Sequence, residues 1–430
     1  MIYCDFIKED IMAIGKKKTS ILFILALVTS LVLVNFGGVV QAKPDFKTWS
    51  NPQSPTTYKT DEIIVKLKGK GHFQKVTLSS GDSVRKALKR YRSRGDVEYA
   101  EPNYIAQASM VPNDPFYIYQ WHLDNPNYGG INTNSAWGVT QGSGTTVAVV
   151  DTGVAYENYS PTRKVRYYRA PDLAQTSFVS GYDFVNKDTH PNDDNSHGTH
   201  VTGTIAQSTN NSVGVAGVSF KASIMPIKVL DKNGYGTYAN IANGIRWAAD
   251  HGAKVINLSL GGPYSATYLE DAVAYAYNKG VTIVAAAGND GASVISYPAA
   301  YNAYVIAVGA TRYDETLAYY SNYGASLDLV APGGDISVDQ NGDGYGDGVL
   351  QNTFNPTTKK TDQFGYWFFQ GTSMATPHAA GTAALVISKG TATTPSGVRQ
   401  VLESTADDLG VVGKDYQYGW GLINAAAAVQ

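Results

Sequence analysis

Hydrophobic residues form short, almost unbroken runs along residues 110–430, and amphipathic stretches lie between them. Such runs are typical of parallel strands that are covered on both faces. The amphipathic stretches 238–252 and 268–280 predict helices, and the second closes with Lys-Gly, a common helix ending. Alternating strands and helices predict an α/β fold: a doubly wound, mostly parallel β-sheet with helices on both faces. The predicted strands are 145–153, 222–230, 253–262, 281–289 and 303–311.

A smaller pattern precedes this region. Residues 43–60 are rich in Pro, Ser and Thr and are interpreted as a linker. Residues 62–68 alternate like a strand, residues 83–94 predict a short basic helix, and residues 97–109 predict a second strand. Together they form a small α+β unit that would be only marginally stable alone.

The N-terminal segment has the features of a secretory signal. Lys16–Lys18 precede an uncharged, apolar run at 21–34, and small residues follow. A membrane-spanning helix needs about 20 apolar residues, which the run nearly reaches if it continues to Val40, so a retained anchor is the alternative. The sequence Val-Gln-Ala at 40–42 fits the cleavage rule. We therefore expect secretion to the extracellular medium, with no membrane association after the signal is removed.

Charge separates the two regions. Residues 43–109 hold 13 basic and 7 acidic residues, a net charge of +6. Residues 110–430 hold 17 basic and 26 acidic residues, a net charge of −9. Opposite charges favour association of the two segments. Nucleic-acid binding by the basic run 85–94 is the alternative, but that run is equally consistent with one solvated helix face, so we expect no nucleic-acid partner. The single cysteine, Cys4, precedes the predicted cleavage point, so the mature chain can form no internal disulfide.

Three polar segments carry candidate chemistry. Asp151 ends an apolar strand, His197 and His200 open a helix of small residues, and Ser373 opens a helix of almost only apolar residues. Residues three apart share a helix face, so the two histidines could bind a metal, but the H-E-x-x-H signature of a zinc hydrolase is absent. A serine at a helix start is by itself more often a cap. As a nucleophile it needs a base, and the base needs an orienting carboxylate.

The sequences DTG at 151–153, HGTHVTG at 197–203 and GTSMATPH at 371–378 resemble the signatures of the subtilisin-like serine proteases, the subtilase family. The resemblance runs from about residue 111 to the C-terminus. It implies that Asp151 is the orienting acid, His197 the general base and Ser373 the nucleophile. AAAGND at 285–290 implies that Asn289 donates a hydrogen bond to the tetrahedral oxyanion.

This resemblance implies a serine endopeptidase that works through an acyl-enzyme. His200 is then expected to pack within its helix. A catalytically silent binding protein with the same fold is the alternative, but it would need a missing active-site residue, and none is missing.

The resemblance also implies the substrate-binding walls and the domain boundaries. Two segments are similar to the edges that pair with an extended peptide, and a third is similar to the primary pocket segment, with serine where glycine is frequent. The expected substrate-binding residues are Ser259, Leu260, Gly261, Gly234, Tyr235, Gly236 and Ser296. The expected domains are a signal peptide at 1–42, an inhibitory prodomain and intramolecular chaperone at 43–110, and a catalytic domain at 111–430. We expect a monomer whose partners are protein and peptide substrates and its own prodomain.

Calcium is the expected structural cofactor. TNNSVGV at 209–215 resembles the family's calcium loop, although an Asn-rich turn alone would have the same composition. The expected ligands are the side chains of Asp114, Asp172 and Asn211 and the carbonyl groups of Thr209, Val213 and Val215.

An insertion at 335–351 has the D-x-N-x-D-G spacing of an EF-hand loop, with Gly344 at the sharp turn. Its twelfth position is Leu350 instead of glutamate, so it is either a differently closed calcium site or a Gly/Asp-rich loop. The expected ligands are Asp339, Asn341, Asp343 and Asp347.

Overall fold

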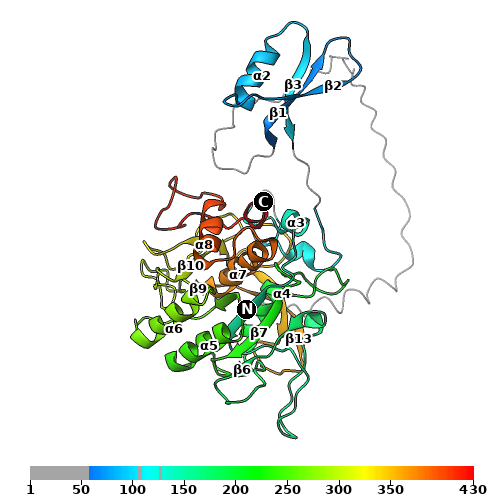
Figure 1. Ribbon diagram of the computed structural model, residues 1–430. Coiled ribbons are helices and arrows are strands. Elements are labelled where there is room, and N and C mark those ends of the chain that lie inside the picture. The colour runs from blue at the N-terminus through cyan, green and yellow to red at the C-terminus, as the bar shows by residue number, and fades with distance from the viewer. Residues whose placement is uncertain (1–57, 105–108, 125–127) are drawn as a thin grey trace, which may run out of the picture. The chain divides into compact units, whose positions relative to one another are not determined.

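The computed structural model describes residues 58–104, 109–124 and 128–430 (Figure 1). The predicted signal peptide and most of the predicted linker lie outside these residues. Within the described part of the chain, no helix is both long and apolar enough to cross a membrane.

The N-terminal unit is a three-stranded antiparallel sheet with one helix. Strands β1 (Tyr58–Leu67), β2 (Phe73–Thr77) and β3 (Val97–Tyr104) pair in the order β2-β1-β3. Ser83 caps helix α2 (Val84–Arg92) by accepting the N–H of Lys86, and basic residues occupy the last turn, as the helix dipole favours. The core is small: Ile63, Val65, Val84, Ala87, Val97 and Ala100.

The second unit is built on an eight-stranded parallel sheet. Its order is β11-β10-β9-β8-β4-β7-β5, and β6 also pairs with β7. The order runs outward from β4 in both directions, which is the doubly wound arrangement that the alternating pattern predicts. The strands are β4 (Thr146–Asp151), β5 (Ser177–Phe178), β6 (Tyr182–Asp183), β7 (Ser223–Lys228), β8 (Val255–Leu258), β9 (Thr282–Ala286), β10 (Val305–Thr311) and β11 (Leu329–Pro332).

Helices cover both faces of this sheet. In β4, Val147 and Val149 belong to the core that packs with α4 and α7, whereas Ala148 and Val150 belong to the core that packs with α5 and α6. The helices are α3 (Thr133–Trp137), α4 (His197–Ala206), α5 (Tyr238–Asp250), α6 (Thr267–Asn278), α7 (Thr372–Lys389), α8 (Pro395–Ser404) and α9 (Ala425–Ala428), and two short 3₁₀ turns are η2 (Tyr117–Tyr119) and η3 (Pro171–Leu173).

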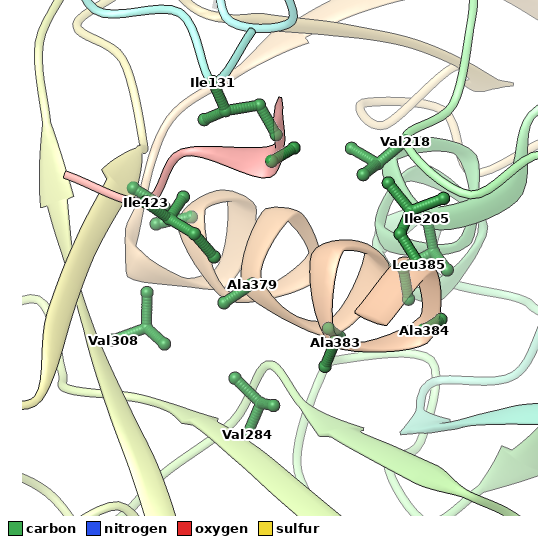
Figure 2. Packing of buried hydrophobic residues seen from close by; sticks show 14 of the residues in the cluster. Ile131, Ile205, Val218, Val284, Val308, Ala379, Ala383, Ala384, Leu385 and Ile423 are labelled. Carbon is green, nitrogen blue, oxygen red and sulfur yellow. The ribbon is translucent and has the colours of Figure 1, made fainter. Parts of the chain in front are cut away.

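Helix α7 is the buried helix that presents the candidate nucleophile. Its small residues allow close packing, and Ala379 and Ala383 face Val308 and Val284 of the sheet (Figure 2). Ile205 of α4 lies near its C-terminal half (Figure 2). Dense packing around a helix of this kind resists displacement, so its first turn is held firmly.

The five predicted strands and the two predicted helices of the large unit are all present, with ends that differ by a few residues. The strand predicted at 97–109 is described only to Tyr104. Sequence patterning missed β2 and the antiparallel pair β12 (Val349–Phe354) and β13 (Phe364–Phe369). The insertion at 335–351 therefore overlaps the first residues of β12.

Candidate active site

Asp151 lies at the carboxyl end of β4, where ligand sites of doubly wound sheets form. The residue is fully buried, and its Oδ1 accepts two hydrogen bonds. One comes from the backbone N–H of Thr152 at 2.7 Å and the other from Nδ1–H of His197 at 2.8 Å. The structure therefore brings the predicted acid and base into direct contact.

His197 is the first residue of α4, and its backbone position is fixed by the turn before it. The Asp193 carboxylate accepts the N–H groups of Asn195, Ser196 and Thr199, which ties this turn to the helix start. Burial lowers the pKa of His197, but the charge and hydrogen bond of Asp151 outweigh burial and raise the pKa above its ordinary value. With Nδ1–H committed to Asp151, Nε2 of His197 is left as a proton acceptor.

Ser373 is the second residue of α7 and is partly exposed. Its hydroxyl donates to the carbonyl oxygen of Ser259 at 3.1 Å. In return, the Ser259 hydroxyl donates to the Ser373 carbonyl at 2.7 Å. The first N–H groups of a helix have no acceptor within it, so the Ser373 N–H is available to an anion.

Asn289 is exposed and lies three residues after the end of β9, and its amide is oriented by Thr372. The Asn289 Oδ1 accepts the N–H of Thr372 at 2.8 Å and the Thr372 hydroxyl at 2.9 Å. The Nδ2 group is consequently left as a donor. A Cβ atom at Gly371 would lie 3.7 Å from both Nδ2 of Asn289 and N of Ser373, so these two donors flank one point.

His200 lies on α4 with His197 but has a different environment. It is fully buried, its ring stacks on Phe369, and its Nε2–H lies 3.1 Å from the Val349 carbonyl and 3.0 Å from the Trp367 carbonyl. Burial lowers its pKa to about 3, so the ring is neutral. These contacts are those of a packed, hydrogen-bonded histidine. Among the residues that the structure describes, no three His, Cys, Asp or Glu side chains gather into a metal-binding group.

Both predicted substrate edges line one cavity of about 320 Å³. His197 and Thr152 line it together with Ser259, Leu260 and Gly261. Gly234, Tyr235 and Gly236 line the same cavity. The structure thus brings the base and both edges to one groove, and their role in substrate binding stays a prediction.

Ser296 lies against Gly261, which lines this groove, and against Gly288. Its Cβ would be 3.1 Å from a Cβ atom built on Gly261, and its Oγ would be 2.5 Å from one built on Gly288. The serine side chain therefore occupies space that these two glycines leave open.

The residues predicted for the first calcium site converge. Asp114 and Asp172 are both buried, and no basic side chain of the described residues forms an ion pair with either. Asp114 accepts the N–H of Asn211, whose Nδ2 donates to Asp172. Burial, reinforced by the charge of Asp114, raises the pKa of Asp172 to about 7. Two uncompensated buried carboxylates fit a bound cation. The predicted carbonyl ligands of Thr209, Val213 and Val215 belong to the same loop.

In the insertion predicted as a second calcium loop, the side chains form hydrogen bonds within the loop itself. Asp339 accepts the N–H groups of Gly342, Asp343 and Gly344, and Asn341 donates to Asp343. In Asp347 one oxygen accepts the N–H of Gln340 and the other is buried without a partner. Burial and the charges of Asp343 and Asp339 raise the pKa of Asp347 to about 6. The Asp347 carboxylate therefore has one oxygen available to a cation.

Several residues around the site were missed by sequence reasoning. Thr372 orients Asn289, and the buried His122 donates through Nδ1–H to Nε2 of His378 at 2.7 Å. Lys228 is fully buried beside Asp151. A lysine inside the apolar run IMPIKVL was the one available signal for Lys228.

Comparison with known proteins gives matches along most of the chain. The model of the subtilase family matches residues 142–421, and that of the fervidolysin N-terminal prodomain matches residues 69–103. A thermophilic serine proteinase of Bacillus sp. (strain AK1) is 40% identical over 396 residues, which cover 92% of this chain and 86% of the relative. Thermitase of Thermoactinomyces vulgaris is 41% identical over 322 residues, covering 74% of this chain and 99% of the relative.

The fold also matches solved structures. A protease from Pseudoalteromonas arctica PAMC 21717 superposes with a TM-score of 0.63 and 33% identity, covering 74% of this chain and 99% of that chain. A cold-adapted subtilisin-like serine proteinase superposes with a TM-score of 0.57 and 31% identity, covering 72% of this chain and 98% of that chain.

Proposed function

The chain belongs to the subtilase family of serine peptidases, and we propose that it is a secreted endopeptidase that cleaves protein substrates through Asp151, His197 and Ser373. The single observation that supports this most is the 2.8 Å hydrogen bond between Asp151 and His197, a residue that lines the same groove as both predicted substrate edges. A peptide laid along these edges would bind mainly through its backbone, which permits many sequences.

In the proposed reaction the Ser373 hydroxyl turns from the Ser259 carbonyl to Nε2 of His197. Ser373 Oγ attacks the scissile carbonyl carbon while Nε2 takes its proton. The imidazolium is stabilised by Asp151, and the oxyanion is stabilised by Nδ2 of Asn289 and the N–H of Ser373. His197 then protonates the leaving amine, which breaks the peptide bond and leaves an acyl-enzyme. Water attacks the ester carbon while Nε2 of His197 takes its proton. The bond to Ser373 Oγ then breaks, and His197 returns the proton to that oxygen as the acid product leaves.

Covalent labelling tests the nucleophile. We expect a sulfonyl fluoride to abolish hydrolysis of a casein substrate, because an activated serine attacks this reagent. Each protein molecule should gain one sulfonyl group. Mass spectrometry of the digested protein should place the adduct on Ser373, whereas heat-unfolded protein should gain none. Full activity in excess reagent, or an adduct elsewhere, would contradict the proposal.

The acid limb of the pH profile tests the base. The pKa of His197 is raised above 6.5, and the imidazolium cannot accept a proton. We therefore expect kcat/KM to fall as pH decreases, with a midpoint above 6.5, in assays of a peptide p-nitroanilide. Asp151→Asn should move the remaining activity's midpoint to lower pH, because the stabilising charge is lost. A wild-type midpoint well below 6.5 is the contradicting result.

The primary pocket is proposed to be narrowed by Ser296. A hydroxymethyl group beside Gly261 and Gly288 takes volume from large substrate side chains and offers a hydroxyl to polar ones.

Maturation is proposed to proceed by removal of a signal peptide at 1–42 and of the prodomain, whose described part is the β1–β3 unit. The match of residues 69–103 to a prodomain model supports synthesis as a zymogen. We propose that the prodomain of 43–110 inhibits the catalytic domain of 111–430 until the enzyme cleaves it off.

Structural calcium is proposed at the loop 209–215. Asp114, Asp172 and Asn211 would hold the ion with carbonyl groups of Thr209, Val213 and Val215. A bound calcium ion would supply the positive charge that the buried carboxylates lack and would join three segments of a chain without disulfides. The Asp339–Asp347 loop stays a second predicted site.

Chelation should reveal this calcium. A ligand present at 100 times its Kd adds about 2.7 kcal/mol to stability. For a domain of this size that corresponds to a fall of about 4 °C in Tm after treatment with EDTA, measured by scanning calorimetry on inhibited enzyme.

Asp172→Asn should show a much smaller EDTA effect, and Asp347→Asn tests the second loop in the same way. Asp183→Asn, another buried carboxyl, is the matched control and should keep the full effect. An unchanged wild-type midpoint in EDTA would refute structural calcium.

A further inference from the structure

Lys228 is a fully buried lysine at the last position of β7, inside an otherwise apolar strand. It lies directly beside Asp151 in the parallel register of β7 and β4. Burying an ammonium group is costly unless each of its N–H groups finds an acceptor. Burying a hydrophobic residue here would cost less free energy than burying an ammonium group, so packing alone does not explain a lysine at this position.

All three donors of the Lys228 ammonium are used. Nζ donates to the Thr152 carbonyl at 2.5 Å, to the Leu230 carbonyl at 2.9 Å and to the Asp194 carboxylate at 2.7 Å. Asp194 is partly exposed and supplies the counter-charge. The ammonium thereby joins the end of β4, the end of β7 and the loop before α4.

Thr152 connects Lys228 to the acid and the base. Its N–H donates to the same Asp151 oxygen that accepts His197 Nδ1–H, at 2.7 Å. Its hydroxyl donates to Asp193 at 2.9 Å and accepts the N–H of Gly198, the residue after His197, at 2.9 Å. Every polar group of Thr152 is therefore fixed by a partner, and its carbonyl is fixed by Lys228.

We propose that Lys228 is a positioning residue of the catalytic site, which holds the Thr152 carbonyl so that Asp151 stays aligned with His197. This inference rests on the proposed function, since it assigns Lys228 to the same acid–base pair. Lys228 touches neither substrate nor the reacting atoms. It acts by fixing the peptide that follows Asp151 and by balancing the negative charge of Asp194 and Asp193 near the imidazole.

Lys228→Met removes the ammonium and keeps a long apolar side chain. The Thr152 carbonyl then loses its donor, and the Asp151 carboxylate loses its fixed direction. We expect kcat to fall about 10²-fold, the typical cost of a misplaced catalytic group, with KM changed less than about threefold. The low-field proton resonance of His197 Nδ1–H should weaken or broaden, since it reports the bond to Asp151.

The pH profile separates this role from a purely structural one. The charges that act on His197 are those of Asp151 on β4 and Asp193 in the preceding loop, and the neutral His200 lies on the same helix. Lys228 on β7 acts on Asp193 and is itself paired with Asp194. In Lys228→Met the hydrogen bond from His197 to Asp151, which raises the pKa of His197, should weaken, so the acid limb should move to lower pH. A change of charge alone would move it to higher pH. Asp194→Asn removes a negative charge, so its acid limb should move to lower pH.

Met225→Ala is the matched control, because Met225 is buried on the same strand and pairs with Ala148, three positions before Asp151. It should lower Tm and leave kcat, the acid limb and the Nδ1–H resonance unchanged. If folded Lys228→Met behaves like Met225→Ala, the proposal is wrong. If Lys228→Met does not fold, Asp194→Asn decides, and an unchanged acid limb in that variant overturns the proposal. Loss of wild-type activity in Ser373→Ala tests the proposed function separately.

Discussion

The Ser373→Ala variant is expected to lose about 10⁶-fold in kcat, because the acyl-enzyme cannot form without the hydroxyl. The remaining activity would come from the oxyanion donors acting on water. The precursor of this variant should also keep its prodomain, since maturation is proposed to use the same site. Initial rates on a peptide p-nitroanilide and the mass of the purified precursor measure the two effects.

The fold should survive this change, because Ser373 Oγ makes a single hydrogen bond, to the Ser259 carbonyl, and the residue is partly exposed. Ser388→Ala at the other end of α7 is the matched control and should process and turn over normally. Wild-type rates or a cleaved precursor in Ser373→Ala would show that another residue is the nucleophile.

The central sheet could be predicted because its strands are apolar on both faces. Val147–Val150 show this clearly, since successive residues enter opposite cores and all are buried. Strand β12 is equally buried but contains Gln351, Asn352 and Thr353. Their side-chain donors bond to carbonyl groups of other segments, such as that of Ala216 for Nε2 of Gln351, and hydrophobic patterning contains no such information.

The candidate site shows the same limit. Because ligand sites of such sheets form at the carboxyl ends of the strands, the sequence predicts that Asp151 lies at the site. The structure places Asp151 in contact with His197 there. Hydrogen bonds between residues far apart in sequence could not be predicted. Thr372 and Asn289 are 83 residues apart, and His122 and His378 are 256 residues apart, so neither pair has a local signature. The sequence motifs identify the reacting groups, whereas the contacts that orient them require the fold.

The Asn289→Ala variant is expected to lose about 10²–10³-fold in kcat with little change in KM, because its amide donates only once the carbonyl oxygen becomes negative. The orientation of Asn289 supports this expectation. Its Oδ1 is occupied by the N–H and the hydroxyl of Thr372, so the donor Nδ2 cannot be exchanged for the acceptor by a flip of the amide.

Asn289→Asp sharpens the same prediction. Aspartate can still accept both hydrogen bonds from Thr372, but it has no N–H and places a negative charge beside the developing oxyanion. We therefore expect its kcat to be at or below that of Asn289→Ala, while its Tm stays closer to the wild-type value. Asn278→Ala, at the exposed end of α6, is the control and should leave kcat unchanged. An Asn289→Asp variant with near-wild-type kcat would mean that the oxyanion is stabilised without this amide, by the helix N-terminus alone.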